Sequence, residues 1–293
     1  MSNQAPGTPA RVNGGAAAPS GRVVALTIAG SDSGGGAGIQ ADLKTFHALG
    51  VFGTSAITAL TAQNTMGVRS VHPVPLAMVR DQVNVVVEDL APRAVKTGML
   101  ATSELVGEVA ALLEAHALRR YVLDPVMVAT SGDRLLDRDA EGAVATLLVP
   151  RAALVTPNLD EARILTGLPV KGEDGQREAA RALVEMGAGA ALVKGGHGEG
   201  DELVDLLWDG QEEYIWRRPR LATRNTHGTG CTLSAGVTAG LALGDPLEVA
   251  VDRALDFVAR AIATAPNLGG GPDREGTDRA GHGPLNHFVT VER

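Results

Sequence analysis

One short stretch of the chain, residues 225–232 with the sequence NTHGTGCT, has the residue types that bind a phosphate group. Gly228 and Gly230 let the backbone turn so that its N–H groups converge on one point. The small-residue run at 233–243 reads as a helix that starts at Cys231, and its positive dipole end would face the same point. The stretch therefore predicts an anion hole, although an ordinary glycine-rich helix start would have the same composition.

Cys231 lies in the first turn of this expected helix. A helix N-terminus lowers the pKa of a thiol, and the sulfur could face the bound anion. The same pattern fits a small buried cysteine, so the motif by itself leaves both interpretations open. For His227, inside the same stretch, we expect support of the backbone rather than proton transfer.

Four further side chains could handle the charge of a phosphate or a metal ion. Asn158 and Glu161 stand three residues apart at a helix start, where the carboxylate could hold a magnesium-bound water and the amide could contact a phosphate. The same spacing fits a capping box, which needs no ligand. Asp124 is either a turn former or a second acidic group near the metal. Lys194, at a strand end, either neutralises phosphate charge or is simply solvated.

A second glycine-rich segment, residues 33–38, follows the first expected strand. It fits neither the Walker A pattern nor G-x-G-x-x-G, so a flexible loop over a ligand and a phosphate cradle are both compatible with it. Asp42, one helical turn further on, could accept hydrogen bonds from a polar ligand or be a solvated helix carboxylate.

Short apolar runs alternate with amphipathic runs from residue 22 onward, which predicts the elements that position these residues. The expected strands are 22–29, 54–60, 94–96, 121–123, 154–156 and 190–194, and the expected helices are 39–49, 75–90, 103–115, 159–165, 176–186, 231–243 and 246–265. Residues 203–216 read as a hairpin turning at Asp209 and Gly210. This order predicts an α/β domain with a doubly wound, mostly parallel sheet.

Such sheets bind ligands at the carboxyl ends of their strands. Polar and glycine-rich segments do follow the expected strands, as the rule requires. These segments are 30–32, 63–65, 96–99, 124–125, 156–158 and 194–197.

Composition limits the class of protein. A chain of 293 residues with 44% hydrophobic content can bury one large core, and we expect a single domain over 22–293 after a disordered tail at 1–21. The net charge of -8 argues against nucleic acid or a membrane surface as the main partner. The single cysteine suits a reducing compartment, and the chain has neither a long apolar run nor a signal peptide, so we expect a cytoplasmic protein.

Taken together, these motifs closely resemble the hydroxymethylpyrimidine/phosphomethylpyrimidine kinases of thiamine synthesis, which belong to the ribokinase-like superfamily. The resemblance runs from about Val23 to Phe288. It rests on the segments 29–44, 62–65, 96–100, 156–162, 194–197, 225–231 and 281–284.

The resemblance implies a three-layer α/β/α sandwich that uses ATP and Mg²⁺ to phosphorylate 4-amino-5-hydroxymethyl-2-methylpyrimidine to its phosphate and then to the pyrophosphate. It implies catalytic roles for Cys231, Gly228, Thr229 and Gly230. The pyrimidine pocket would be lined by Gly30, Asp42, Gln63, Met99 and Val126. ATP contacts would come from Asn158, Lys194 and Thr226, and the metal site would lie at Glu161 and, through water, Asp124. Gln63 would read the ring nitrogen and amino group. The family's dimers imply a homodimer.

Some questions stay open at this level. Thr61 departs from the apolar residue expected there and puts fine substrate preference in question. A pyridoxal-type vitamin kinase and a non-catalytic regulator of the same fold are the alternatives. A primary alcohol benefits from a base more than a phosphate monoester does, so we hypothesise that Cys231 assists the first phosphorylation and matters less in the second.

Overall fold

The computed structural model describes residues 22–127, 138–196, 200–269 and 281–289. The expected tail at 1–21 and His197 lie outside the described residues. Within the described part, no helix is both long and apolar enough to cross a membrane.

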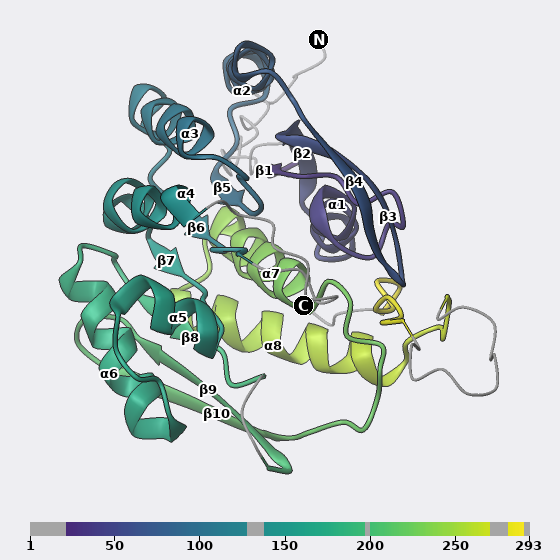
Figure 1. The fold of residues 1–293 in the computed structure, drawn as a ribbon, viewed down its shortest axis with the longest axis vertical. Helices are drawn as coiled ribbons and strands as arrows, with labels where there is room; N and C mark the ends of the chain where they lie inside the picture. The colour runs from purple at the N-terminus through teal and green to yellow at the C-terminus, as the bar shows by residue number, and fades with distance from the viewer. Residues whose placement is uncertain (1–21, 128–137, 197–199, 270–280, 290–293) are drawn as a thin grey trace, which may run out of the picture.

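In the described part of the chain, eight strands form one twisted sheet in the order β10-β9-β8-β7-β6-β5-β1-β2 (Figure 1). Its parallel strands are β1 (Val24–Ala29), β2 (Phe52–Ile57), β5 (Ala94–Thr97), β6 (Tyr121–Leu123), β7 (Leu154–Val155) and β8 (Ala191–Val193). The hairpin of β9 (Glu202–Trp208) and β10 (Glu213–Pro219) continues it antiparallel. The predicted mostly parallel sheet and its terminal hairpin are thus confirmed.

Helices cover both faces of the sheet and complete the expected ribokinase-like three-layer sandwich (Figure 1). On one face, α1 (Gly38–Ala48), α7 (Thr229–Leu243) and α8 (Leu247–Ala263) bury their apolar sides. On the other face lie α2 (Leu76–Leu90), α3 (Ser103–Ala115), α4 (Arg138–Ala143), α5 (Leu159–Thr166) and α6 (Gly172–Glu185). The central strands β1, β5, β6, β7 and β8 are buried on both sides, which is why they read as continuous apolar runs.

The prediction of a single strand at 54–60 is wrong, because this range spans the end of β2 and the start of a second strand. The chain leaves the sheet at Thr58, whose N–H donates to Ala29 and whose hydroxyl donates to the Met99 carbonyl. It then forms a separate two-stranded antiparallel ribbon, β3 (Ala59–Asn64) and β4 (Gly67–Pro73). Gln63 therefore lies within β3 rather than at a strand exit. The ribbon packs few apolar side chains, so it carried no strand signal of its own.

Helical structure at 138–151 was also not expected. After α4, a π-helical turn (Val144–Leu148) and a 3₁₀ turn (Val149–Arg151) lead to β7. Val144 and Leu148 are buried against the neighbouring helices, so tertiary packing supports this irregular segment. Helix α7 starts two residues earlier than expected, at Thr229, because Gly228 adopts the left-handed conformation just before it.

The strand order reverses between β1 and β5, since the chain continues to β2 on one side of β1 and to β5 on the other. A crevice at the carboxyl ends of the strands is expected at such a point. The exits of β1, β5, β6 and β8 bring Gly30, Met99, Asp124 and Lys194 to this edge, beside the start of α7.

Candidate functional site

The start of α7 has the geometry of an anion-binding turn. The N–H and the hydroxyl of Thr229 both donate to the Thr226 carbonyl, at 3.2 and 2.7 Å, and close the turn. Gly228 has a φ of 84°, which favours glycine. The first amide groups of a helix have no acceptor within it, so those of Gly230 and Cys231 can face an anion.

The two glycine-rich segments pack directly on each other. A Cβ on Gly228 would collide with the carbonyl oxygen of Gly36, and a Cβ on Gly36 would collide with the ring of His227. Only glycine permits this approach. The loop at 33–38 is therefore one wall of the anion site, a placement that its sequence alone left open.

Asp32 connects these two segments, although from the sequence we expected nothing of it beyond its place at a strand exit. Its carboxylate accepts the N–H groups of Gly34, Gly36 and Ala37 at 2.8 to 3.0 Å and contacts His227 Nε2 at 2.8 Å. Burial by itself would raise the pKa of Asp32, but His227 and the amide donors outweigh it and lower the pKa. His227 thus supports the loop backbone, as expected from its position.

Lys194 lies between two carboxylates at the mouth of this turn. Its Nζ is 3.4 Å from Asp124 Oδ1 and 3.9 Å from Glu161 Oε2. Burial would lower the pKa of Lys194, but the charges of Asp124 and Glu161 outweigh it and raise the pKa. A Cβ on Gly230 would lie 3.3 Å from Nζ, so the cation adjoins the start of α7. Ser234, from α7, donates to Asp124 at 3.1 Å.

Asn158 and Glu161 form the capping box that the spacing allowed. The Asn158 side chain accepts the Glu161 N–H at 2.9 Å, and Glu161 Oε2 accepts the Asn158 N–H at 2.8 Å. Desolvation raises the pKa of Glu161 to about 7, even though the Lys194 charge opposes the shift. Among the described residues, no three His, Cys, Asp or Glu side chains converge as a metal-binding group.

The raised pKa of Glu161 leads us to predict how the stability of the fold depends on pH. The native state holds a proton on this carboxyl between its ordinary pKa near 4.5 and about 7, whereas the unfolded state does not. The free energy of unfolding should therefore fall as pH rises through this window. In Glu161→Gln this fall should be absent, whereas Asp160→Asn, an exposed neighbour in the same helix turn, should keep it. Urea unfolding at several pH values measures this, and identical profiles for both variants would contradict it.

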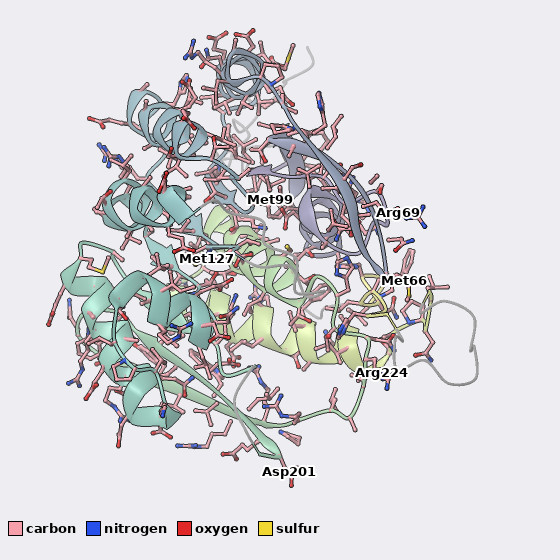
Figure 2. The ribbon with its side chains drawn as sticks, viewed as in Figure 1. Met66, Arg69, Met99, Met127, Asp201 and Arg224 are labelled. Atoms are coloured by element: carbon pink, nitrogen blue, oxygen red, sulfur yellow. The ribbon has the colours of Figure 1, made fainter. Side chains whose placement is uncertain are left out.

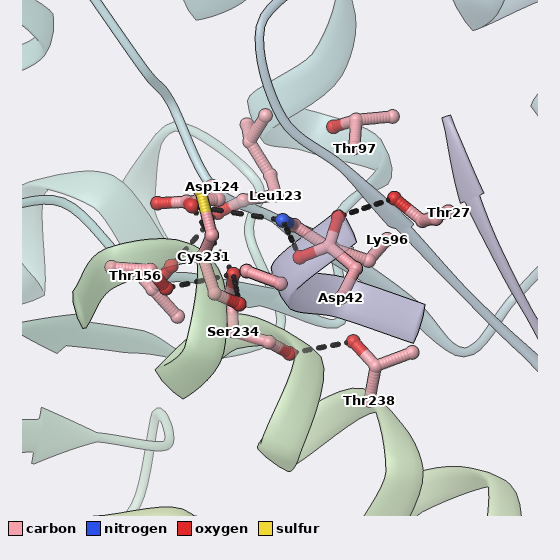
Figure 3. Close-up of polar contacts among 12 residues, drawn as sticks. Thr27, Asp42, Lys96, Thr97, Leu123, Asp124, Thr156, Cys231, Ser234 and Thr238 are labelled. Carbon is pink, nitrogen blue, oxygen red and sulfur yellow. Dashed lines mark hydrogen bonds and ion pairs between the residues drawn. The ribbon is translucent and has the colours of Figure 1, made fainter. Parts of the chain in front are cut away.

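Below the anion site lies a buried ion-pair cluster (Figure 3). Lys96 is fully buried, and its Nζ lies 2.7 Å from Asp42 Oδ1 and 3.9 Å from Asp124 Oδ2. The other oxygen of Asp42 accepts the hydroxyl of Thr27 at 2.7 Å. Asp42, expected in the pyrimidine pocket, has an inaccessible side chain with both oxygens engaged, and its contact with a substrate stays a prediction. The sequence assigned no role to Lys96, although it begins one of the segments at the strand ends.

Cys231 stands between this cluster and the anion site (Figure 3). Desolvation raises the pKa of its thiol to about 11, since it outweighs the favourable effects of the Lys96 charge and of the Gly38 N–H. The nearby carboxylates of Asp42 and Asp124 add to the rise. The expected lowering of the thiol pKa by the helix start is therefore wrong: removal from water dominates the local dipole.

The remaining expected pocket residues gather at the same edge of the sheet. Met99 and Val126 are partly exposed, Gly30 is buried, and a Cβ on Gly30 would lie 3.2 Å from Met99 Sδ. Figure 2 shows Met99 and Met127 near the middle of the molecule. Gln63 reaches in from the ribbon, with Nε2 3.5 Å from His227 Nε2. Thr226 is half-buried, with its hydroxyl 3.4 Å from His282 Nδ1.

Comparison with known proteins agrees with this geometry. A family model described as phosphomethylpyrimidine kinase matches residues 32–275. The hydroxymethylpyrimidine/phosphomethylpyrimidine kinase of Bacillus subtilis (strain 168) is 47% identical over 266 residues, which are 90% of this chain and 94% of that protein.

Solved structures are similar over most of the chain. A phosphomethylpyrimidine kinase from Clostridium difficile 630 has a TM-score of 0.75 at 39% identity and covers 82% of this chain and 100% of its own. The pyridoxal kinase of Staphylococcus aureus in complex with AMP-PCP and pyridoxal has a TM-score of 0.79 at 35% identity, over 91% of this chain and 94% of its own. The fold is thus shared by kinases named for phosphomethylpyrimidine and for pyridoxal.

Proposed function

The chain belongs to the phosphomethylpyrimidine kinase family, and we propose that it carries out both phosphorylations expected from its motifs. The first converts 4-amino-5-hydroxymethyl-2-methylpyrimidine to its phosphate, and the second converts that phosphate to the pyrophosphate used in thiamine biosynthesis. The proposal depends mainly on one observation: Lys194, with Asp124 and Glu161 on either side of it, lies beside the first amide groups of α7.

The nucleotide side of the site would be formed by the cation and its flanking groups. Lys194 would neutralise charge on the phosphates, with Asn158 and Thr226 as further ATP contacts. The carboxylates of Glu161 and, through water, Asp124 fit Mg²⁺, which prefers oxygen ligands and keeps several of its waters. When bound, Mg²⁺ would reduce the charge on the phosphates during transfer.

The acceptor side would use the opposite wall. Gly30, Asp42, Gln63, Met99 and Val126 would surround the pyrimidine, and Asp42 also holds Lys96. Gly228, Thr229 and Gly230 would cradle the phosphoryl group during transfer. Cys231 would assist removal of the hydroxyl proton in the first step, at the point where acceptor and phosphoryl group meet.

Steady-state ATP consumption with three separate acceptors tests the proposal. The hydroxymethyl and phosphomethyl pyrimidines should each show a kcat/KM at least about tenfold above that of pyridoxal, since Gln63 offers a paired donor and acceptor to an aminopyrimidine. A preference for pyridoxal would favour the vitamin-kinase alternative. Tight ligand binding without ATP turnover would favour the non-catalytic regulator.

We also propose a cytoplasmic homodimer. The exposed apolar side chains of Leu60 and Val71 on the β3–β4 ribbon and of Met78 on α2 support association of two copies. Sedimentation equilibrium at micromolar concentration tests it, and a mass equal to one chain would refute it.

A further inference from the structure

Thr61 and Gln63 lie two residues apart on β3, and their side chains meet. Thr61 Oγ1 lies 2.7 Å from the carbonyl oxygen of Ser31 and 3.3 Å from Gln63 Oε1. The Gln63 backbone is held on both sides by Ser33, whose hydroxyl donates to the Gln63 carbonyl at 2.7 Å and accepts the Gln63 N–H at 2.8 Å. A register shift between Ala62 and Gln63 marks the same point.

The Thr61 hydroxyl has one proton to give, and the nearer acceptor takes it. The Ser31 carbonyl can only accept, so the proton lies on the 2.7 Å contact. A lone pair of Thr61 Oγ1 is then turned toward Gln63. Only the NH₂ group of the amide can donate to that lone pair.

The other amide atom, Gln63 Nε2, faces His227 Nε2 at 3.5 Å. That nitrogen is 2.8 Å from Asp32 Oδ2, and an ionised carboxylate only accepts, so His227 Nε2 carries a proton. It cannot accept a second proton from an NH₂ group. Of the two amide atoms, only the carbonyl oxygen could form a hydrogen bond on this side.

In the structure Oε1 lies on the Thr61 side and Nε2 on the His227 side. Both neighbours favour the amide turned by half from this orientation, with Nε2 toward Thr61 and Oε1 toward His227. A half-turn of the amide exchanges these two atoms without changing the shape of the side chain, so the hydrogen-bond partners decide between the two orientations. We propose that Thr61, together with the Asp32–His227 pair, fixes the orientation of the Gln63 amide and so determines which way round an aminopyrimidine binds.

This inference rests on the proposed function, and it has a consequence for the reaction. The free Nε2 hydrogen would face a ring nitrogen and Oε1 would face the adjacent amino group. In the substrate, the carbon that bears the hydroxymethyl group comes next to the carbon that bears the amino group. With Oε1 on the His227 side, the hydroxymethyl group would lie on that side too, toward Gly228 and Cys231, where phosphoryl transfer would occur. The opposite orientation would turn it away.

The test is a double-mutant cycle on the full chain. Thr61→Val keeps the shape but removes the acceptor, and it should lower kcat/KM for the hydroxymethyl pyrimidine by about tenfold, the effect of one hydrogen bond, with the KM for ATP unchanged. Thr61→Ser should restore activity to within about twofold. In a Gln63→Met background, Thr61→Val should have no further effect, because the amide it orients is gone.

An equal loss from Thr61→Val in both backgrounds would overturn the inference, since the effect would then come from the Ser31 contact. Thr61→Ala serves the same cycle if the valine variant does not fold. If the wild-type protein does not phosphorylate the pyrimidine, the cycle is repeated on pyrimidine binding by calorimetry. Additive binding losses would then overturn the inference separately from the proposed function, and absence of binding would overturn both.

Discussion

Cys231→Ala is expected to lower kcat for phosphorylation of the hydroxymethyl pyrimidine by about a hundredfold, the lower range for loss of a general base. The same variant should lower kcat for the phosphomethyl pyrimidine by less than about threefold, because a phosphate monoester is already ionised near neutral pH and needs no base. Rapid-quench measurements of each half-reaction separate the two steps. Equal losses in both steps would contradict this role for Cys231.

The raised pKa of this thiol adds a pH dependence to the prediction. With a pKa of about 11, roughly one molecule in ten thousand carries the thiolate at pH 7, and this fraction rises about tenfold per pH unit below the pKa. The ratio of wild-type to Cys231→Ala rates in the first step should therefore increase from pH 6 to pH 9. Cys231→Ser, which keeps the size of the side chain, serves as the matched control. A ratio that does not change with pH would show that the thiol does not titrate during the step.

Lys96→Met is expected to lower the free energy of unfolding by about 3–5 kcal/mol, because it leaves the buried carboxylate of Asp42 without its cation. Both side chains are completely inaccessible to solvent. Burial by itself would lower the pKa of Lys96, but the charge of Asp42, together with that of Asp124, outweighs it and raises the pKa, so the lysine stays charged in the native protein. Urea unfolding monitored by circular dichroism measures the change.

An exposed ion pair with the same distance between its charged atoms provides a matched control. Arg80 and Glu108 also meet at 2.7 Å, but the Arg80 side chain is 52% exposed. Arg80→Met should therefore cost far less, since water replaces the lost partner. Adding Asp42→Asn to Lys96→Met should recover part of the loss, because the unpaired charge is removed. Similar losses for Lys96→Met and Arg80→Met would refute a special contribution of the buried pair.

Several local features could be predicted from the sequence because each depends only on residues that are neighbours in the chain. The glycine-rich start of α7, the Asn158–Glu161 capping box and the hairpin turn near Gly210 each need only a few consecutive residues with defined backbone preferences. The alternation of apolar runs and helices likewise fixed a mostly parallel sheet, and with it the edge at which the candidate residues meet.

The features that only the tertiary structure could show depend on contacts between residues far apart in the chain. The ribbon that presents Gln63 has too few buried side chains to be read from periodicity, and Asp32 meets His227 across 195 positions. Desolvation is also a property of the whole fold: the fold buries the Asp42 side chain beside Lys96, and burial raises rather than lowers the pKa of Cys231. The sequence alone therefore determined the fold class and the position of the anion site, whereas the charge states and hydrogen-bond partners within that site depended on which distant groups pack around them and exclude water.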